Sequence, residues 1–368
     1  MQLFLDLFGN VLRFTWQEGV MLLIGGVLIY LAIRREMEPA LLLPMGFGAI
    51  LVNLPCVNTG AIETLFQAGV ASELFPLLLF IGIGAMIDFG PLLSNPRLLL
   101  FGAAAQFGIF FTLVLAAALG FPLVDAASVA IIGAADGPTS IYVANYFSSQ
   151  YQGAIMVAAY SYMALVPVVQ PPIIRAVTTK KERQIRMDYA PSGVSKTTRI
   201  LFPILATVVA GALAPKSAEL IGFLMFGNLL RECGVLDSLS QSAQHELANL
   251  ITLVLGLSVS FQMRAELFIT WQTLLILLLG LVAFIFDTLG GVLFAKLLNL
   301  FSAKKINPMI GAAGISAFPM SCRVVHRMGQ EEDPGLFLLM HAAGANVGGQ
   351  IASVIAGGLI ITLVEGLL

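Results

Sequence analysis

The segment IIGAADGPTSIY, from Ile131 to Tyr142, places a carboxylate beside a glycine and a proline within strongly apolar sequence. A charged side chain at the centre of a membrane helix costs about 2.5–3.5 kcal/mol, and proline removes a backbone donor. Because non-helical backbone survives at that depth only against protein or water, the ADGP sequence predicts a hairpin tip with Asp136 facing a polar cavity. Oxygen ligands of this kind suit Na+ or a proton. The alternative is an aspartate that only caps a helix in a loop.

A second segment of this character runs from Asn307 to Met328 and reads NPMIGAAGISAFPMSCRVVHRM. Two prolines bracket a tip that contains Gly311 and Ser316. Asn307 and Ser316 offer neutral oxygens to a cation, and Arg323 places a fixed positive charge at the mouth of the segment. Each has a structural alternative: helix capping for Asn307, close helix packing for Ser316 and the setting of membrane topology for Arg323.

Three further stretches carry polar groups within apolar runs. The glycine-rich stretch HAAGANVGGQIASVIAGG contains Asn346, which offers an amide oxygen, and Ser353, which helix packing explains equally well. The stretch AIMVAAYSYMALVP contains Tyr160 and Tyr162; Tyr162 lies mid-span, where a site role and an interfacial role both stay open. Asp287, in AFIFDTLGG, is a mid-span carboxylate that an arginine could neutralise.

The composition indicates which class of protein must position these groups. Of 368 residues, 58% are hydrophobic and 11% are charged, whereas a soluble domain carries about 25% charged residues. Apolar runs of about 17–25 residues, long enough to cross a bilayer, recur from end to end. We therefore expect an all-α polytopic membrane protein. The net charge of −2 gives no reason to expect a nucleic acid partner, and the three cysteines lack metal-site spacing.

The apolar runs divide the chain into two halves joined by a basic linker. In the first half, 18–175, we expect spans at 18–34, 39–56, 73–93, 98–120 and 153–175, with an extra run at 126–147. In the second half, 199–368, we expect spans at 199–214, 217–231, 247–263, 270–298 and 336–364, with an extra run at 306–325. Residues 1–17 fit an amphipathic segment in the membrane interface, and residues 176–198 form the linker.

The two halves resemble each other at an offset close to 174–178 residues. LFIGIGAMIDF, ending at Phe89, matches LVLGLSVSFQM, ending at Met263, and AIIGAADGPTS matches PMIGAAGISAF. Lysines and arginines crowd the linker and flank the run 306–325, and the positive-inside rule places them in the cytoplasm. That placement requires both extra runs to be re-entrant hairpins, which leaves five crossings in each half. An odd number inverts the second half, so we expect an inverted repeat with ten crossings and two hairpin tips near the bilayer midplane.

Four motifs in order carry a resemblance to a known family: IGIGAMIDFGPLLSNP, GAADGPTSIY, AAYSYMALVPVVQPPI and NPMIGAAGISAFPMSCRVVHRMGQEEDPG. The chain, from about residue 18 onward, resembles the beta subunit of sodium-pumping biotin-dependent decarboxylases, which serve oxaloacetate, methylmalonyl-CoA and glutaconyl-CoA systems. The resemblance implies a fold like that of elevator-type carriers and a homotrimer. It also implies a small single-span gamma or delta subunit, soluble biotin-carrier and carboxyltransferase subunits, and a bacterial or archaeal plasma membrane with a cytoplasmic linker.

The resemblance also implies an activity and a set of site residues. Family members decarboxylate carboxybiotin, consume a proton and couple CO2 release to Na+ export, so Na+ and carboxybiotin on a partner subunit are expected. The expected catalytic residues are Asp136, Tyr162 and Arg323, of which Arg323 binds the carboxybiotin carboxylate. The expected Na+ ligands are Asp136, Asn307, Gly311, Ser316 and Asn346.

Two alternatives predict the same hairpins without this chemistry. An elevator-type Na+/dicarboxylate symporter would move a solute with Na+ and would need neither biotin nor a covalent step. A non-enzymatic anchor for soluble decarboxylase subunits would leave the intramembrane Asp136 and Asn307 without a role. The choice of acyl substrate, in the family, is made by a partner subunit outside this chain.

Overall fold

The structure is a computed structural model that describes residues 14–55, 57–187, 193–302 and 304–368. Every regular element in these ranges is a helix, which confirms the all-α class. Most of the expected interfacial segment 1–17 and part of the linker, 188–192, lie outside the described residues. Helix α2 (Trp16–Arg34) begins within that expected segment at a capping box, in which the side chains of Thr15 and Glu18 each accept from the other's backbone N–H.

Helices long and apolar enough to cross a membrane account for eight of the ten expected spans. Six single stretches qualify among the described residues: α2; Pro96–Ala118, which contains α7 (Leu99–Ala104) and α8 (Phe107–Ala118); α13 (Lys196–Leu213); Asp237–Met263, which contains α16 (Ala248–Val259); α18 (Trp271–Phe301); and α21 (Leu339–Glu365). Two bent pairs raise the number to eight: Gly60–Ala71 with α5 (Leu74–Met86), and the two parts of α11 (Gln152–Val177). These helices confirm a polytopic membrane protein.

The two other expected spans form shorter helices. The run 39–56 gives α3 (Pro39–Val52), of 14 residues, and the run 217–231 gives α14 (Ala218–Glu232), of 15 residues. Each is about 21–23 Å long, less than the roughly 30 Å of a hydrocarbon core. The expected span 153–175 is not straight, because α11 bends by 67° between Met163 and Leu165. Pro167 causes the bend, since in a straight helix its ring clashes with the carbonyl of residue 163.

Hairpin one is a helix–break–helix segment, as its glycine and proline predict. It consists of α9 (Leu123–Ala130), the 3-10 turn η4 (Ile131–Ala134) and α10 (Gly137–Tyr146). Ala135 is left-handed, with φ of 51°, and Asp136 is extended, so the helix ends there. Ser149 Oγ donates to Asp125 Oδ1 over 2.6 Å, which brings the chain that leaves the segment back to the chain that enters it.

Hairpin two comprises α19 (Met309–Ala312), an irregular tip and α20 (Met320–Glu332). Helix α20 continues beyond the expected end at residue 325. The prediction ended too early because the last two turns of the helix are polar and carry no membrane signal. The two ends of the hairpin meet at α12 (Lys180–Arg183) in the linker. Asn307 Nδ2 donates to the Arg183 carbonyl over 2.7 Å, and the Arg183 guanidinium pairs with Glu332 at 2.6 Å.

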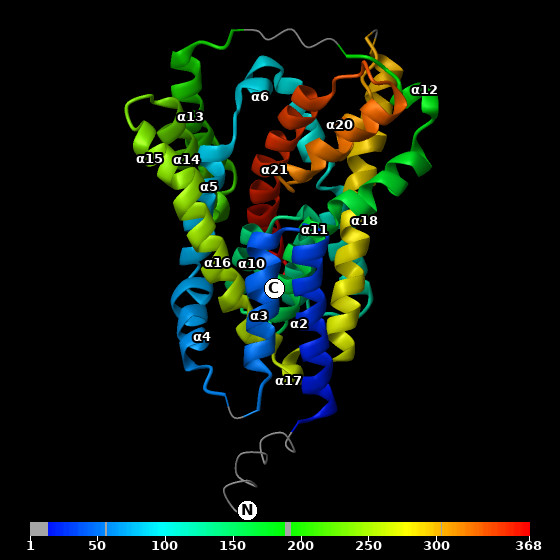
Figure 1. Ribbon diagram of the computed structural model, residues 1–368. Coiled ribbons are helices and arrows are strands. Elements are labelled where there is room, and N and C mark those ends of the chain that lie inside the picture. Colours follow the sequence, from blue (N-terminus) through cyan, green and yellow to red (C-terminus); the bar gives the residue numbers. More distant parts are fainter. Residues whose placement is uncertain (1–13, 56, 188–192, 303) are drawn as a thin grey trace, which may run out of the picture.

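The two hairpins approach α21 from opposite ends. Helix α21 has 27 residues, a length of about 40 Å. Tyr146, at the end of hairpin one, donates to Glu365 at the C-terminal end of α21, whereas hairpin two leads through residues 333–338 into its N-terminal end. Figure 1 shows α12 and α20 together at one end of the molecule, from which α18 and α21 run toward the other. At the tips, the Ser316 N–H donates to the Ala134 carbonyl over 3.1 Å.

Glycines let α5 and α14 pack backbone against backbone. A Cβ built on Gly84 would lie 1.8 Å from the Leu224 carbonyl oxygen, and one on Gly227 would lie 2.0 Å from the Ile81 carbonyl oxygen. Both distances are far below van der Waals contact, so neither position accepts a side chain without moving the helices apart. Helix α10 of hairpin one packs against α5, so the glycine contact also supports the hairpin.

Replacing Gly84 with alanine is expected to destabilise the protein. Inserting a methyl group into a close contact costs about 1–3 kcal/mol, and about 1 kcal/mol shifts the unfolding midpoint of a domain of 150–250 residues by about 2–4 °C. Gly26→Ala on α2 is the matched control, because no atom lies within 4 Å of its built Cβ. Thermal unfolding in detergent should show a lower midpoint for Gly84→Ala alone; equal midpoints would contradict the packing argument.

Candidate functional site

Asp136 lies at the tip of hairpin one, against the middle of α21. Its side chain is 4% exposed and occupies the N-cap position of α10, where the partial positive charge of the helix end favours an anion. Asp136 Oδ2 accepts hydrogen bonds from Thr139 Oγ1 at 2.6 Å and from Ser353 Oγ at 3.0 Å. Counted from Leu339, Ser353 is residue 15 of the 27 in α21. The carboxylate is therefore placed half-way along that helix.

A stripe of buried polar side chains on α21 faces the hairpin tips. Asn346, Gln350 and Ser353 are spaced by four and three residues, which puts them on one face of the helix. Asn346 Nδ2 donates to the Ile315 carbonyl over 2.7 Å, and Gln350 Nε2 donates to the Ser316 carbonyl. The amide nitrogens of the stripe therefore hold the tip of hairpin two.

The amide oxygens of the same stripe are left for another partner. Asn346 Oδ1 and Gln350 Oε1 are buried and accept no hydrogen bond from the described residues. Buried oxygens rarely stay unpaired in proteins. Together with Asp136, which is bonded to Ser353 on this stripe, they offer one carboxylate and two neutral oxygens where the hairpins meet. Such a set of hard oxygen donors suits a small cation such as Na+.

The donor set differs from that of a transition-metal site. Among the residues that the structure describes, no group of three or more His, Cys, Asp or Glu is placed to hold a metal ion. Nitrogen and sulfur ligands are what zinc and copper prefer, whereas amide and carboxylate oxygens suit hard cations. The donors of the Asp136 cluster are therefore of the oxygen type that suits hard cations.

The structure places Tyr160, rather than Tyr162, next to Asp136. A Cβ built on Gly137 would lie 2.1 Å from the Tyr160 ring, so that ring packs directly on the start of α10. The Tyr160 hydroxyl is buried and has no hydrogen-bond partner among the described residues. Tyr162 instead donates its hydroxyl to the Leu277 carbonyl of α18. Because residues two apart on a helix point in different directions, only Tyr160 packs on Gly137, the residue after Asp136.

Two of the expected Na+ ligands have structural partners elsewhere. Asn307 Nδ2 donates to the Arg183 carbonyl, and Asn307 Oδ1 accepts the Met309 N–H over 3.1 Å. Gly311 packs against α18, where its built Cβ would lie 2.0 Å from the Gly291 carbonyl oxygen. The Asn307 contact is of the kind that its capping alternative expects, and both contacts fix the base of hairpin two.

Three of the expected residues lie where the hairpin tips meet α21: Asp136, Ser316 and Asn346. Ser316 reaches α21 directly, because its Oγ donates to the Gly349 carbonyl over 3.1 Å. Gln350 was missed by the sequence reasoning, and the role of Ser353 was left open. The signal that identifies both is their helical spacing from Asn346.

Arg323 lies on the exposed face of α20, at the linker end of the molecule. It lines a cleft of about 400 Å³ with Arg175, Arg327 and Glu331. Glu331 pairs with Arg175 at 3.0 Å and with Arg327 at 3.5 Å, whereas Arg323 has no salt bridge within the described chain. A charged neighbour of Arg323 is Glu38, at the start of α3. Burial raises the pKa of the Glu38 carboxyl, and the positive charge of Arg323 acts to lower it. Arg323 is therefore the cation of this cleft that is available to an incoming anion.

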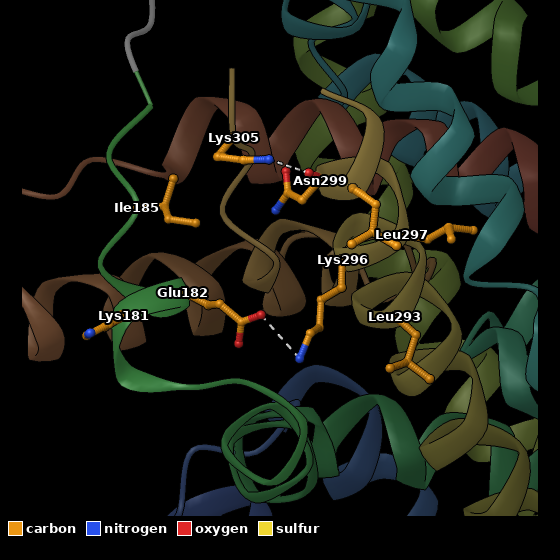
Figure 2. A pocket seen from close by; sticks show the side chains of 9 residues that line it. Lys181, Glu182, Ile185, Leu293, Lys296, Leu297, Asn299 and Lys305 are labelled. Carbon is orange, nitrogen blue, oxygen red and sulfur yellow. Dashed lines mark hydrogen bonds and ion pairs between the residues drawn. The ribbon is translucent and has the colours of Figure 1, made fainter. Parts of the chain in front are cut away.

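A larger cavity, of about 600 Å³, lies between α12 and the C-terminal end of α18. Figure 2 shows its ion pair between Glu182 and Lys296, at 3.2 Å, and the hydrogen bond from Lys305 to the Asn299 carbonyl, at 2.5 Å. These contacts tie the linker to α18. The residues that line this cavity include neither a buried carboxylate nor the unpartnered amide oxygens of the Asp136 cluster.

Membrane helices in which two broken segments meet half-way along a span, around a buried carboxylate, form the architecture of an ion-translocating carrier. A family model described as the Na+-transporting oxaloacetate decarboxylase beta subunit matches residues 17–364. The chain belongs to this family, and the resemblance drawn from its four motifs is thereby confirmed.

Curated relatives align over almost their whole length. The chain is 49% identical over 358 residues to the glutaconyl-CoA decarboxylase subunit beta of Acidaminococcus fermentans, with 96% of this chain and 95% of the relative covered. It is 48% identical over 357 residues to the methylmalonyl-CoA decarboxylase subunit beta of Veillonella parvula, with the same coverage of 96% and 95%. It is 43% identical to the probable oxaloacetate decarboxylase beta chain of Vibrio cholerae, with 97% and 98% covered.

Proposed function

We propose that this chain is the membrane subunit of a primary sodium pump that decarboxylates carboxybiotin, consumes a proton and couples these steps to Na+ export. The observation that carries the proposal is the cluster at the hairpin tips. There, buried Asp136 is held by Ser353 beside the unpartnered oxygens of Asn346 and Gln350. Membership of a family of Na+-transporting decarboxylase beta subunits supports the same ion and the same reaction over a symporter without covalent chemistry.

The chemistry begins at the Arg323 cleft. Carboxybiotin, carried by a partner subunit, is an anion, and the Arg323 guanidinium binds its carboxylate through two parallel N–H···O bonds. When the N–C bond breaks, CO2 leaves and the electron pair stays on the biotin nitrogen. That nitrogen then takes a proton from an acid, which makes one consumed proton per turnover.

Asp136 couples the proton to Na+ because its surroundings tolerate no unbalanced charge. An unpaired carboxylate at this depth is costly, so Asp136 holds either a Na+ ion or a proton. A proton that displaces Na+ from Asp136 releases the ion, and the loss of that proton toward the biotin nitrogen prepares the site for the next Na+. Asn307, Gly311 and Tyr162 contribute through the positions of hairpin two and α18, where their contacts lie.

We place the linker in the cytoplasm and treat both hairpins as re-entrant. Basic side chains gather at the linker end, around the two cavities there: Arg175, Lys181, Lys296, Lys305, Arg323 and Arg327. The positive-inside rule puts such residues in the cytoplasm. The matching motifs and the approach of the hairpins from opposite ends of α21 support an inverted repeat of ten crossings. Helices α3 and α14 then cross within protein or a thinned bilayer, and an elevator-like movement carries Asp136 between the two faces.

The assembly follows from the family and from helices that this chain leaves uncovered. The share buried within the chain is 11% for the membrane stretch of α13 and 17% for that of α2. These faces fit lipid, further copies of the chain in a homotrimer, and a single-span gamma or delta subunit. Soluble biotin-carrier and carboxyltransferase subunits dock at the linker end, where Arg323 is exposed. The location is the plasma membrane of a bacterium or archaeon.

Proteoliposomes that contain the complete complex test the function. With the linker end outward, added carboxybiotin is expected to drive accumulation of radioactive Na+ inside, with CO2 released in step with uptake. A symporter would instead show dicarboxylate uptake by this chain alone, without biotin. A mere anchor would show decarboxylation with no response to Na+. Either of these results would overturn the proposal.

A further inference from the structure

A second buried carboxylate, Asp287 on α18, has no role in the function proposed above. Its side chain is 0% exposed. Its Oδ1 accepts the Ile109 N–H of α8 over 3.2 Å, whereas Oδ2 accepts no hydrogen bond from the described residues. The arginine partner that the sequence suggested is not among these contacts. Asp287 therefore combines full burial with one oxygen atom that has no donor.

The unpartnered oxygen faces hairpin one. A Cβ built on Gly133 of η4 would lie 2.6 Å from Asp287 Oδ2, and one on Gly108 of α8 would lie 2.7 Å from Oδ1. The carboxyl group is thus wedged between α8 and the 3-10 turn that leads into Asp136, three residues after Gly133. Two buried carboxylates therefore flank the same short turn. Asp136 follows the turn and contacts α21, and Asp287 contacts the turn from α18.

The surroundings of Asp287 select a proton rather than Na+. A metal cation of this kind needs several oxygen ligands, whereas the contacts of this carboxyl group are the backbone N–H groups of Gly108 and Ile109 and the close faces of Gly108 and Gly133. An ionised carboxylate there would be an uncompensated buried charge, which proteins avoid by protonation. A neutral acid with its hydroxyl on Oδ2 requires no counter-ion.

Neighbouring titratable groups do not supply a counter-ion either. Helices α7, α8, η4 and α19, all packed on α18, contain no titratable side chain. The other elements packed on α18 contain Asp125 on α9 and Tyr160, Tyr162 and Arg175 on α11, and α18 itself contains Lys296. Arg175 pairs with Glu331 and Lys296 with Glu182, both at the linker end.

We propose that Asp287 is a second intramembrane cation site, a proton-binding carboxyl group that holds α18 against the tip of hairpin one. Loss of its proton would leave a charge in contact with Gly133 and α8, so ionisation requires the hairpin or α8 to move and admit water. Protonation of Asp287 then favours the packed position of hairpin one, and that packing favours protonation of Asp287 to the same extent. Proton binding by Asp287 does not depend on whether Asp136 binds Na+.

Infrared spectroscopy of the complete complex tests the proton directly. At neutral pH, Asp287→Asn is expected to lower the intensity of the carbonyl-stretch band of protonated carboxylic acids by the contribution of one group. The matched control is Asp125→Asn, because Asp125 is also buried, at 4% exposure, but accepts hydrogen bonds from Ser149 and Gln150; a loss seen in Asp287→Asn and not in Asp125→Asn assigns the protonated acid to Asp287. An unchanged band in Asp287→Asn would show an ionised Asp287 and overturn the proposal.

Sodium provides the second arm of the experiment. The difference between wild-type and Asp287→Asn spectra is recorded without Na+ and at saturating Na+, and the lost band is expected in both. A difference band present only without Na+ would make Asp287 a sodium ligand and overturn the proton assignment. If the asparagine variant fails to assemble, Asp287→Ser removes the carboxyl group with a smaller side chain, and the same band is read. The two arms report on Asp287 alone, independently of pumping.

Discussion

Replacing Asp136 with asparagine is expected to abolish Na+-dependent decarboxylation and Na+ uptake by the reconstituted complex. The amide keeps the size of the side chain and an oxygen that can accept from Thr139 and Ser353, the present partners. It carries no charge to balance a cation. Removing one member of a buried charge pair costs about 3–5 kcal/mol, and a factor of ten in affinity corresponds to about 1.4 kcal/mol. Cation binding should therefore fall more than about 100-fold, measured as Na+ uptake and CO2 release.

Asp125→Asn separates this effect from damage to the hairpin. Asp125 belongs to the same hairpin and matches Asp136 in exposure, at 4%. Both of its oxygens accept a side-chain hydrogen bond, Oδ1 from Ser149 Oγ at 2.6 Å and Oδ2 from Gln150 Nε2 at 3.3 Å, whereas both side-chain hydrogen bonds of Asp136 go to Oδ2. Near-normal coupled pumping in Asp136→Asn would remove Asp136 from the mechanism. Equal losses in both variants would assign the effect to folding of the hairpin.

The helix break at Asp136 can be predicted from the sequence because it has a local cause. Gly137 and Pro138 cannot continue a buried helix, and the sequence that they interrupt is apolar, so the position of Asp136 at a tip follows from backbone chemistry. The end of hairpin two is less well predicted, since the last turns of α20 are polar and resemble a solvated loop. Membrane hydropathy carries no information about helices that leave the bilayer.

The contacts within the site depend on packing that one sequence does not specify. The sequence around Tyr160 and Tyr162 is equally apolar, so it does not distinguish them. The bend of α11 and its packing on α18 decide that Tyr160 faces Gly137. Asn307 looks like a ligand from its type, yet it meets Arg183 of the linker across more than a hundred residues. By contrast, the stripe from Asn346 to Ser353 obeys helical spacing and was open to prediction.

Replacing Asn346 with alanine is expected to lower the apparent affinity for Na+ by about 10–100-fold. The substitution removes an unpartnered buried oxygen, Asn346 Oδ1, that we assign to the cation. It also removes the Nδ2 donor to the Ile315 carbonyl and to Ser321 Oγ, at 2.7 and 2.8 Å, which hold hairpin two. Hydrogen bonds and ligand contacts that involve a charge are worth about 1.5–3 kcal/mol, which sets the range. The measurement is the Na+ dependence of decarboxylation by the complete complex.

Two comparisons distinguish the ligand role of Asn346 from its role in holding the hairpin. Ser321→Ala removes one acceptor of Asn346 Nδ2 and leaves Oδ1 in place, so a small change in Na+ affinity is expected. Asn228→Ala removes another fully buried asparagine, whose Nδ2 donates to the Ile87 carbonyl and whose Oδ1 is also unpartnered, but on α14. If Na+ affinity falls equally in Asn346→Ala and Asn228→Ala, general loosening of the helices explains both. A fall confined to Asn346→Ala assigns the oxygen to the ion, because Asn346, unlike Asn228, shares a helix face with Ser353, the partner of Asp136.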